Sequence, residues 1–151
     1  MKAAKGGPYL QAALLCERAL REHDNVLSVI RIIDRWHVKT PQRDESDPPF
    51  EFPLQCTAVI TFKSGDFSGK KLLNLCLTDP EGTTSNVAGT PILFEGGDRG
   101  HNVIMNLSLA IKHEGLYWID VSLDDELQTR IPFRIILDYV VSSSTAAQES
   151  H

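Results

Sequence analysis

The amino-acid sequence predicts an all-β protein, an antiparallel β-sandwich of about seven to eight strands. Three observations support this class. Apolar and polar residues alternate with a period of two over several stretches, which is typical of strands with one buried face. Glycine, proline and acidic turn residues separate these stretches at short intervals. The chain has 151 residues, which is enough for one hydrophobic core and too few for two.

The N-terminal part contains the one segment whose secondary structure stays open. Residues 9–22 have the composition of a helix, because alanine, leucine, glutamate and arginine dominate. The same stretch could instead form a strand that turns at residues 23–25 into the next one. Residues 26–38 are rich in β-branched side chains, and we expect a single strand there.

The middle of the chain predicts further strands. Apolar side chains alternate with polar ones over residues 54–62 and again over residues 73–77, and residues 92–94 form a third extended stretch. Serine and glycine separate the first two stretches at residues 64–69. The sequence Asp79-Pro80-Glu81-Gly82 predicts a turn, because proline presets the turn backbone and glycine supplies a positive φ.

The C-terminal third shows the clearest alternation. Residues 103–111, 117–123 and 127–137 each have apolar side chains at every second position, and short polar turns join them. This pattern predicts a three-stranded antiparallel meander. Pro132 has no N–H, so we expect its strand to be an edge strand or to bulge there.

Three stretches together resemble a known family. They are residues 13–17 with 27–34 (ALLCE and LSVIRIID), residues 75–82 (LCLTDPEG), and residues 115–121 with 131–134 (GLYWIDV and IPFR). Across about residues 12–137 the chain is similar to a family of small, uncharacterised bacterial single-domain proteins expected to be immunoglobulin-like, macroglobulin-type β-sandwiches. The resemblance implies that residues 10–21 form a strand in a hairpin with the next one. The residues that match are fold motifs, and the resemblance implies no catalytic residue.

The sequence indicates one domain. We expect residues 1–8 to be a flexible extension, residues 9–140 to form the β-sandwich, and residues 141–151 to be a flexible tail. No apolar run approaches the roughly 20 residues that span a bilayer. The run at residues 10–16 is too short for the core of a signal peptide. With three cysteines and no C-x-x-C pair, we expect a reduced, cytoplasmic protein.

The sequence contains no assembled catalytic or metal-binding motif. Cys16 and Cys56 lie among core positions, and Cys76 shares the parity of outward-facing residues. No histidine lies at zinc-ligand spacing. We therefore expect a protein without metal, cofactor or enzymatic activity. An enzyme would require at least two of four side chains to converge in one cleft, namely those of Cys76, His37, His101 and His113.

Charge is distributed unevenly along the chain. Residues 1–43 carry eight basic and four acidic residues, giving +4; the remainder carries seven and sixteen, giving −9, and the sum is −5. The acidic total argues against nucleic acid as a partner. If residues 26–38 form one strand, Arg31, Arg35 and His37 share a face and could receive an acidic partner, with Trp36 on the other face. Internal pairing with glutamates, or solvation, is the alternative.

These features predict a non-enzymatic interaction module that binds a protein partner. Exposed strand edges could add a strand from that partner or join two copies of the chain. The alternative is a carbohydrate- or small-ligand-binding sandwich in which Trp36, Trp118 and Tyr117 face the ligand. The predicted binding residues are Arg31, Arg35, Trp36, His37 and Trp118.

Overall fold

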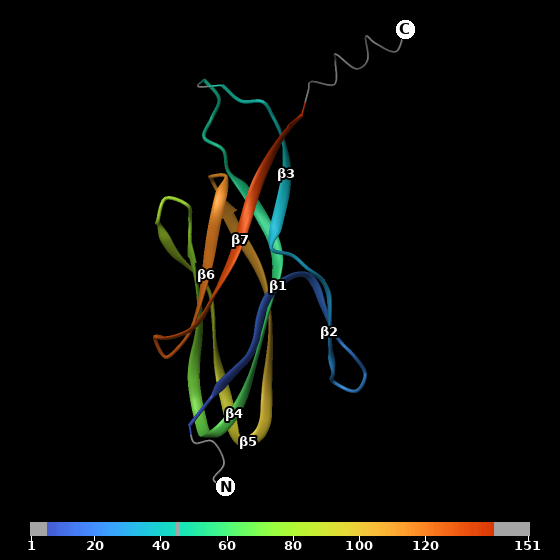
Figure 1. Ribbon diagram of the computed structural model, residues 1–151, viewed down its shortest axis with the longest axis vertical. Coiled ribbons are helices and arrows are strands. Elements are labelled where there is room, and N and C mark those ends of the chain that lie inside the picture. The colour runs from blue at the N-terminus through green and yellow to red at the C-terminus, as the bar shows by residue number, and fades with distance from the viewer. Residues whose placement is uncertain (1–5, 45, 141–151) are drawn as a thin grey trace.

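The computed structural model describes residues 6–44 and 46–140, which form seven β-strands and no helix (Figure 1). The strands are β1 (Tyr9–Arg21), β2 (Leu27–Ile32), β3 (Arg35–Pro41), β4 (Phe52–Thr78), β5 (Thr84–Ile111), β6 (Gly115–Leu123) and β7 (Glu126–Val140). The predicted all-β class is confirmed. No helix in the described part of the chain is long and apolar enough to cross a membrane.

The seven strands form one continuous sheet. Their order is β2-β1-β4-β6-β7-β3, and β5 pairs with β4. The first half of β4 pairs with β1 and the second half with β6, while β5 runs antiparallel along nearly the whole of β4. β3 and β7 run parallel to each other. β4 therefore has a neighbour on both sides over residues 57–63 and 73–78.

The ribbon made by β4 and β5 bends back on itself near its middle (Figure 1). Four glycines with positive φ lie at the bend: Gly65 at 62°, Gly69 at 138°, Gly96 at 89° and Gly97 at 66°. Glycine has no Cβ, so it takes these angles without steric cost. The bend curls the sheet, and Phe62 of β4 meets Phe94 of β5 edge-on with ring centroids 5.8 Å apart.

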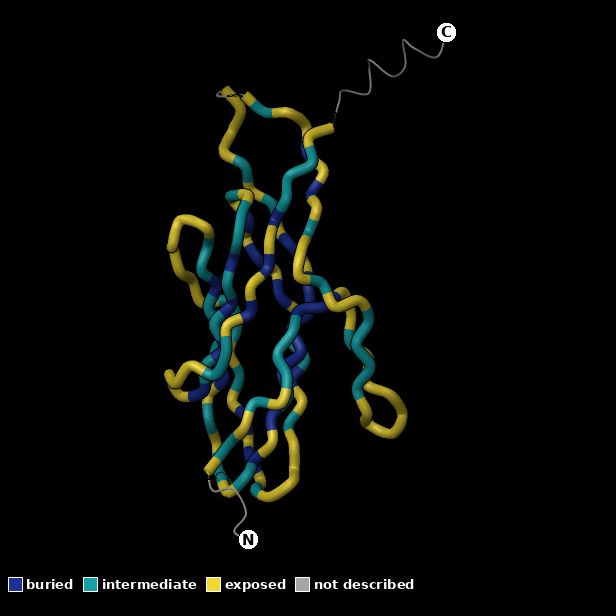
Figure 2. The backbone as a smooth tube through the Cα atoms, in the orientation of Figure 1, coloured by how far each residue is buried: buried dark blue, intermediate teal, exposed yellow. Residues whose placement is uncertain are grey.

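One hydrophobic core fills the inside of the curled sheet. Buried and exposed residues alternate along the central strands, as the period of two predicts (Figure 2). Tyr117 is buried against Phe133, with the two rings stacked at 5.2 Å. Its hydroxyl donates to the carbonyl oxygen of His113 at 2.6 Å, which satisfies a polar atom in an apolar setting.

Residues 9–21 form a strand, so the hairpin implied by the family resemblance is confirmed and the helical alternative is wrong. Helix propensity is a weak preference that tertiary pairing overrides. β1 pairs with β4 through residues 9–16 and with β2 through residues 16–21, so ladder hydrogen bonds are available along its length.

The single strand predicted over residues 26–38 is wrong. β2 ends at Ile32 and β3 begins at Arg35, and Arg31 adopts a left-handed φ of 57° just before the break. β2 pairs with β1, whereas β3 pairs with β7 at the opposite end of the strand order. The β-branched residues correctly indicate extended backbone, but they carry no information about a change of neighbour.

The predicted meander holds for β6 and β7 but not for β5, which pairs with β4 instead. The stretches predicted at residues 54–62 and 73–77 are two halves of β4, and those at 92–94 and 103–111 belong to β5. The intervening glycines make a bend, not a hairpin end. The turn at residues 79–82 is confirmed, since the Gly82 N–H donates to the Asp79 carbonyl at 3.0 Å.

Pro132 lies at a position of β7 where β6 is the one strand paired with it in the described part of the chain. It is opposite Trp118 of β6, and β3 begins alongside β7 only at Arg134. This is the edge position that the missing N–H predicts.

Of the predicted flexible ends, residues 1–5 and 141–151 lie outside the described residues. Gly6 accepts a hydrogen bond from the Asp66 N–H at 2.7 Å.

Candidate functional site

A β-hairpin projects from the body of the molecule (Figures 1 and 2). β1 pairs with β4 up to Cys16, and from there to Arg21 it pairs with β2 alone. We call residues 17–32 the projecting hairpin. Its side chains are exposed or half-buried, in contrast to the buried side chain of Cys16 where the hairpin leaves the sheet.

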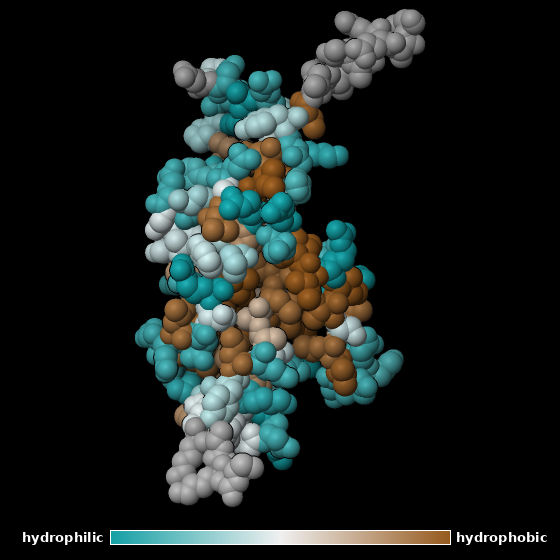
Figure 3. Space-filling model, viewed as in Figure 1, coloured by the Kyte–Doolittle hydropathy of each residue, from teal (hydrophilic) through white to brown (hydrophobic). Residues whose placement is uncertain are grey.

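The projecting hairpin has an apolar surface. Val26 is 58% exposed and Ile32 66% exposed, and Leu27, Val29 and Ile30 are half-buried. Figure 3 shows apolar side chains gathered over β1 and β2. Contiguous exposed apolar surface on a protein marks interaction sites more often than isolated apolar residues do.

One edge of β2 has no strand beside it among the described residues. The Glu22 N–H donates to the Val26 carbonyl at 2.8 Å. Hydrogen-bonded pairs recur at every second residue of an antiparallel ladder. Ser28 and Ile30 therefore direct their backbone groups to β1, and Leu27 and Val29 direct theirs outward. These outward groups can pair with an added strand.

The other sheet edges carry features that hinder strand addition, and β2 largely lacks them. β3 bears outward charges and ends in Pro41, and β5 contains Pro91 and several glycines. Charge, proline and irregular backbone are common protections of edge strands. β2 contains no proline, glycine or lysine. Its one charged side chain, Arg31, is paired with Glu17 at 3.2 Å.

An open groove of about 470 Å³ runs between the projecting hairpin and the sheet. Its lining residues come from β1, β2, β4 and β5, and they are Gln11, Ala12, Leu27, Thr61, Lys63, Gly100 and Asn102. Leu27 contributes the hairpin's side of this groove. The surface around the free edge of β2 therefore combines apolar contact with polar groups that can orient a bound segment.

The predicted basic strip does not form as expected. Arg31 lies on β2 and is paired with Glu17, whereas Arg35 and His37 lie on β3. Because residues 26–38 are two strands with different neighbours, Arg31 does not share a face with the other two. The Nδ1 atom of His37 is 3.1 Å from the Asp138 carboxylate.

The two tryptophans lie on opposite faces of the sheet. Trp36 packs toward the core, edge-on to Phe133 at 5.6 Å. Trp118 lies on the outer face, where the Arg130 guanidinium is 4.6 Å from the centre of its ring. Arg130 also donates to Asp120 at 2.7 Å. Since Tyr117 is buried, these rings do not form an aligned aromatic surface for a sugar.

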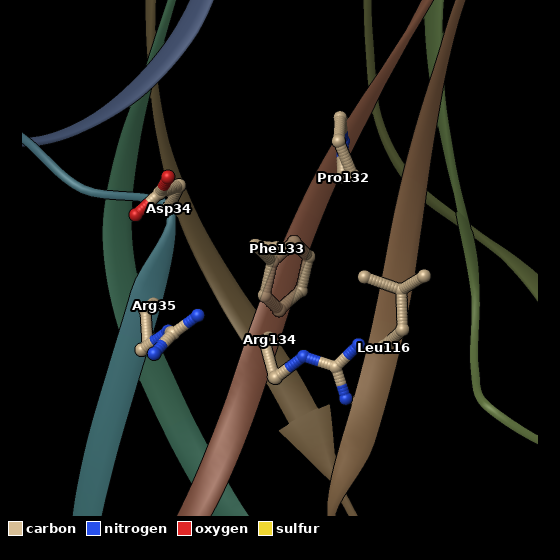
Figure 4. Close-up of a pocket in the computed structure, with 6 residues that line it drawn as sticks. All are labelled: Asp34, Arg35, Leu116, Pro132, Phe133 and Arg134. Carbon is tan, nitrogen blue, oxygen red and sulfur yellow. The ribbon is translucent and has the colours of Figure 1, made fainter.

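The structure adds a residue that the sequence alone did not single out, Arg134. It is the register partner of Arg35 in the parallel β3–β7 pair, and both side chains are exposed. Together they line a hollow of about 180 Å³ (Figure 4). Alternation on the predicted strand over residues 127–137 does point Arg134 outward. Its pairing with Arg35 depends on the position of β3, which has no local sequence signal.

Among the described residues, no hydrogen bond or ion pair joins any two of the side chains that an enzyme would need, those of Cys76, His37, His101 and His113. Cys16 and Cys56 are buried as predicted, and burial raises the pKa of both thiols, that of Cys56 to about 11. Cys76 is half-buried. His113 lies 3.6 Å from Glu81, whereas His37 is paired with Asp138. Within residues 6–44 and 46–140, no three histidine, cysteine or acidic side chains gather to hold a metal.

The fold and its surfaces define an all-β protein with a curled sheet and a projecting apolar hairpin. Residues 11–136 match the model of a family of unknown function, DUF6941, and the chain belongs to that family. A search of curated proteins found no match.

Several solved structures are similar to parts of the chain. The β-glucosidase of Listeria innocua in complex with glucose matches at 13% identity and a TM-score of 0.46, covering 91% of this chain and 17% of its own. The Pseudomonas fluorescens alkylpurine DNA glycosylase AlkC matches at 6% identity and a TM-score of 0.46, covering 82% and 30%. The chain thus spans less than a third of either protein. Neither likeness supports an inference about activity.

Proposed function

We propose that the protein is a non-enzymatic interaction module that binds a protein partner in the cytoplasm. The docking element is the projecting hairpin, and the partner contributes an extended segment that pairs with the free edge of β2. The observation that carries this proposal is an edge strand with apolar side chains and little of the protection found on β3 and β5.

Strand addition accounts for both properties of the hairpin. The outward backbone groups of Leu27 and Val29 provide main-chain hydrogen bonds, which supply affinity, and side chains beside them supply specificity. Covering Val26 and Ile32 removes apolar surface from water, worth about 25 cal/mol per Å². An extended segment with apolar residues at alternate positions meets both requirements.

We also propose an immunoglobulin-like fold and a bacterial source for this protein. The curled sheet is a variant of the immunoglobulin-like sandwich, supported by the way the two halves of the β4–β5 ribbon share one core. The similarity of about residues 12–137 to a family of bacterial proteins supports a bacterial source.

Site-specific photo-crosslinking in the native organism tests the proposal. A photoreactive amino acid replaces Leu27 on β2, or Leu127, which is 55% exposed on β7 and serves as the control. We expect a discrete heavier adduct from position 27 and none from position 127. Adding Val29→Pro should abolish the adduct, because proline removes an outward N–H that β1 does not use.

Three outcomes would contradict the proposal. Equal adducts from positions 27 and 127 would indicate non-specific collision. An adduct that Val29→Pro leaves intact would indicate contact without strand addition. An adduct at twice the 16.8 kDa mass of the chain would identify a second copy in place of a distinct partner.

A further inference from the structure

Two arginines on neighbouring strands lie side by side on the outer face of the sheet, far along the strand order from β2. Arg35 begins β3, and Arg134 is its register partner in β7. The Arg134 N–H donates to the Asp34 carbonyl at 2.9 Å, which fixes the start of β3 against β7. The backbone therefore holds the two arginines in a defined relation.

Neither guanidinium has a partner within the described part of the chain. Three other exposed arginines do have one: Arg31 pairs with Glu17, Arg99 with Glu95, and Arg130 with Asp120. No ion pair is found for Arg18 or Arg21 within the described residues, but neither of these lines a hollow with a second arginine. Asp34 is the acidic residue at the hollow, and it forms no ion pair with Arg35 or Arg134. Figure 4 shows its carboxylate directed away from Arg134. The two guanidinium groups thus form no ion pair within the described residues, and Asp34 lines the same hollow.

The hollow that these arginines line is partly apolar. Leu116 and Pro132 flank it and Phe133 lies beneath, and Figure 4 shows the Arg134 side chain extending toward Leu116. Its volume is about 180 Å³. An apolar cavity of about 150 Å³ accommodates a benzene ring in other proteins. The hollow therefore suits one small group with an apolar body and a negative charge.

We propose that this hollow binds the carboxylate of a small organic acid whose apolar body rests on Leu116 and Pro132. Arg35 approaches from β3 and Arg134 from β7. The planar guanidinium matches the two oxygens of a carboxylate, which a point charge such as lysine does not. The site uses strands that take no part in the proposed partner binding at β2.

A titration followed by ¹H–¹⁵N NMR tests this site, with benzoate as the probe and benzamide as its uncharged counterpart. We expect benzoate to bind at about millimolar concentration and to shift resonances of residues 34–35, 116 and 132–134. Arg35→Gln and Arg134→Gln should each weaken binding by about tenfold. Arg134→Lys should weaken it nearly as much, because lysine keeps the charge and loses the fork.

The matched control is Arg21→Gln, which removes an exposed arginine at the far end of β1, and it should leave benzoate affinity unchanged. Unshifted remaining resonances verify that each variant keeps the fold. The proposal is overturned if benzamide produces the same shifts, if inorganic phosphate binds and benzoate does not, or if the arginine variants bind benzoate as well as the parent. None of these results bears on crosslinking at β2.

Discussion

The Cys56 thiol illustrates how burial determines the chemistry of single residues in this protein. It is only 5% exposed, inside the curled sheet. Burial, with a smaller contribution from the neighbouring Cys16, raises its pKa from 9.0 to about 11. Because the thiolate is the reactive form of cysteine, Cys56 is inert at neutral pH. Its role is packing, as its place among alternating apolar residues of β4 predicts.

This raised pKa predicts a pH-dependent contribution to stability. The folded state favours the neutral thiol, so the contribution is complete below pH 9 and is lost as the pH rises through about 11. Its upper limit is about 3 kcal/mol. Urea unfolding between pH 8 and pH 11 in the presence of a reductant should show the free energy of unfolding of the wild type falling more steeply than that of Cys56→Ala.

The comparison with Cys56→Ala isolates this thiol from other groups that titrate in alkali. Burial also raises the pKa of Tyr117, and that residue is present in both proteins. The alanine variant should be less stable at pH 8 because it loses packing, and the two curves should converge as the pH rises. Parallel curves would show that Cys56 ionises as freely in the folded chain as in the unfolded one.

At the scale of the elements, the bend in β4 and β5 determines the shape of the sheet. Gly65 has a φ of 62°, and a Cβ built on it would lie 2.7 Å from Tyr9 Cε2 and closer still to the Gly6 carbonyl oxygen. Gly97, across the bend, has a φ of 66° and nothing within 4 Å of an added Cβ. A side chain would be strained by the backbone angle at both positions, but its Cβ would meet other atoms at Gly65 and none at Gly97.

Alanine substitution at these two glycines should therefore separate strain from close packing. Gly97→Ala should lower the free energy of unfolding by about 1–2 kcal/mol, the cost of a left-handed alanine. Gly65→Ala should cost at least about 1 kcal/mol more, because backbone and an aromatic ring occupy the space. Equal losses, measured by chemical denaturation, would mean that the N-terminal residues move aside at no cost.

Local patterns in the sequence predict strands well and neighbours poorly. The buried positions of β6 follow from alternation around Tyr117, because a period of two is a property of each strand alone. No local pattern marks the break between β2 and β3, since Ile33 and Asp34 resemble any short extended stretch. For the same reason the sequence points Arg35 outward but cannot place it beside Arg134, which is 99 positions away (134 − 35).

At the scale of the whole molecule, the strand order predicts a gradient of local stability. β4 is flanked by β1 and β5 over residues 57–63 and by β5 and β6 over residues 73–78. Within residues 6–44 and 46–140, β2 has β1 as its only neighbouring strand, and its side chains are half-buried or exposed. Hydrogen bonds with few buried contacts open by local fluctuation, whereas those of a central strand open only on global unfolding.

Hydrogen exchange measured on the isolated protein should reveal this gradient. We expect amides of residues 57–62 and 73–77 to exchange at least about 100-fold more slowly than those of Ser28 and Ile30, which bond to β1. The same experiment at several protein concentrations provides the control, because pairing of β2 between two copies would slow exchange in the hairpin as the concentration rises. Exchange of the outward Leu27 and Val29 amides as slow as in β4, at every concentration, would mean that the free edge is already covered within the chain. The proposed docking of a partner strand on β2 would then fail, because a strand can be added only where backbone groups are accessible.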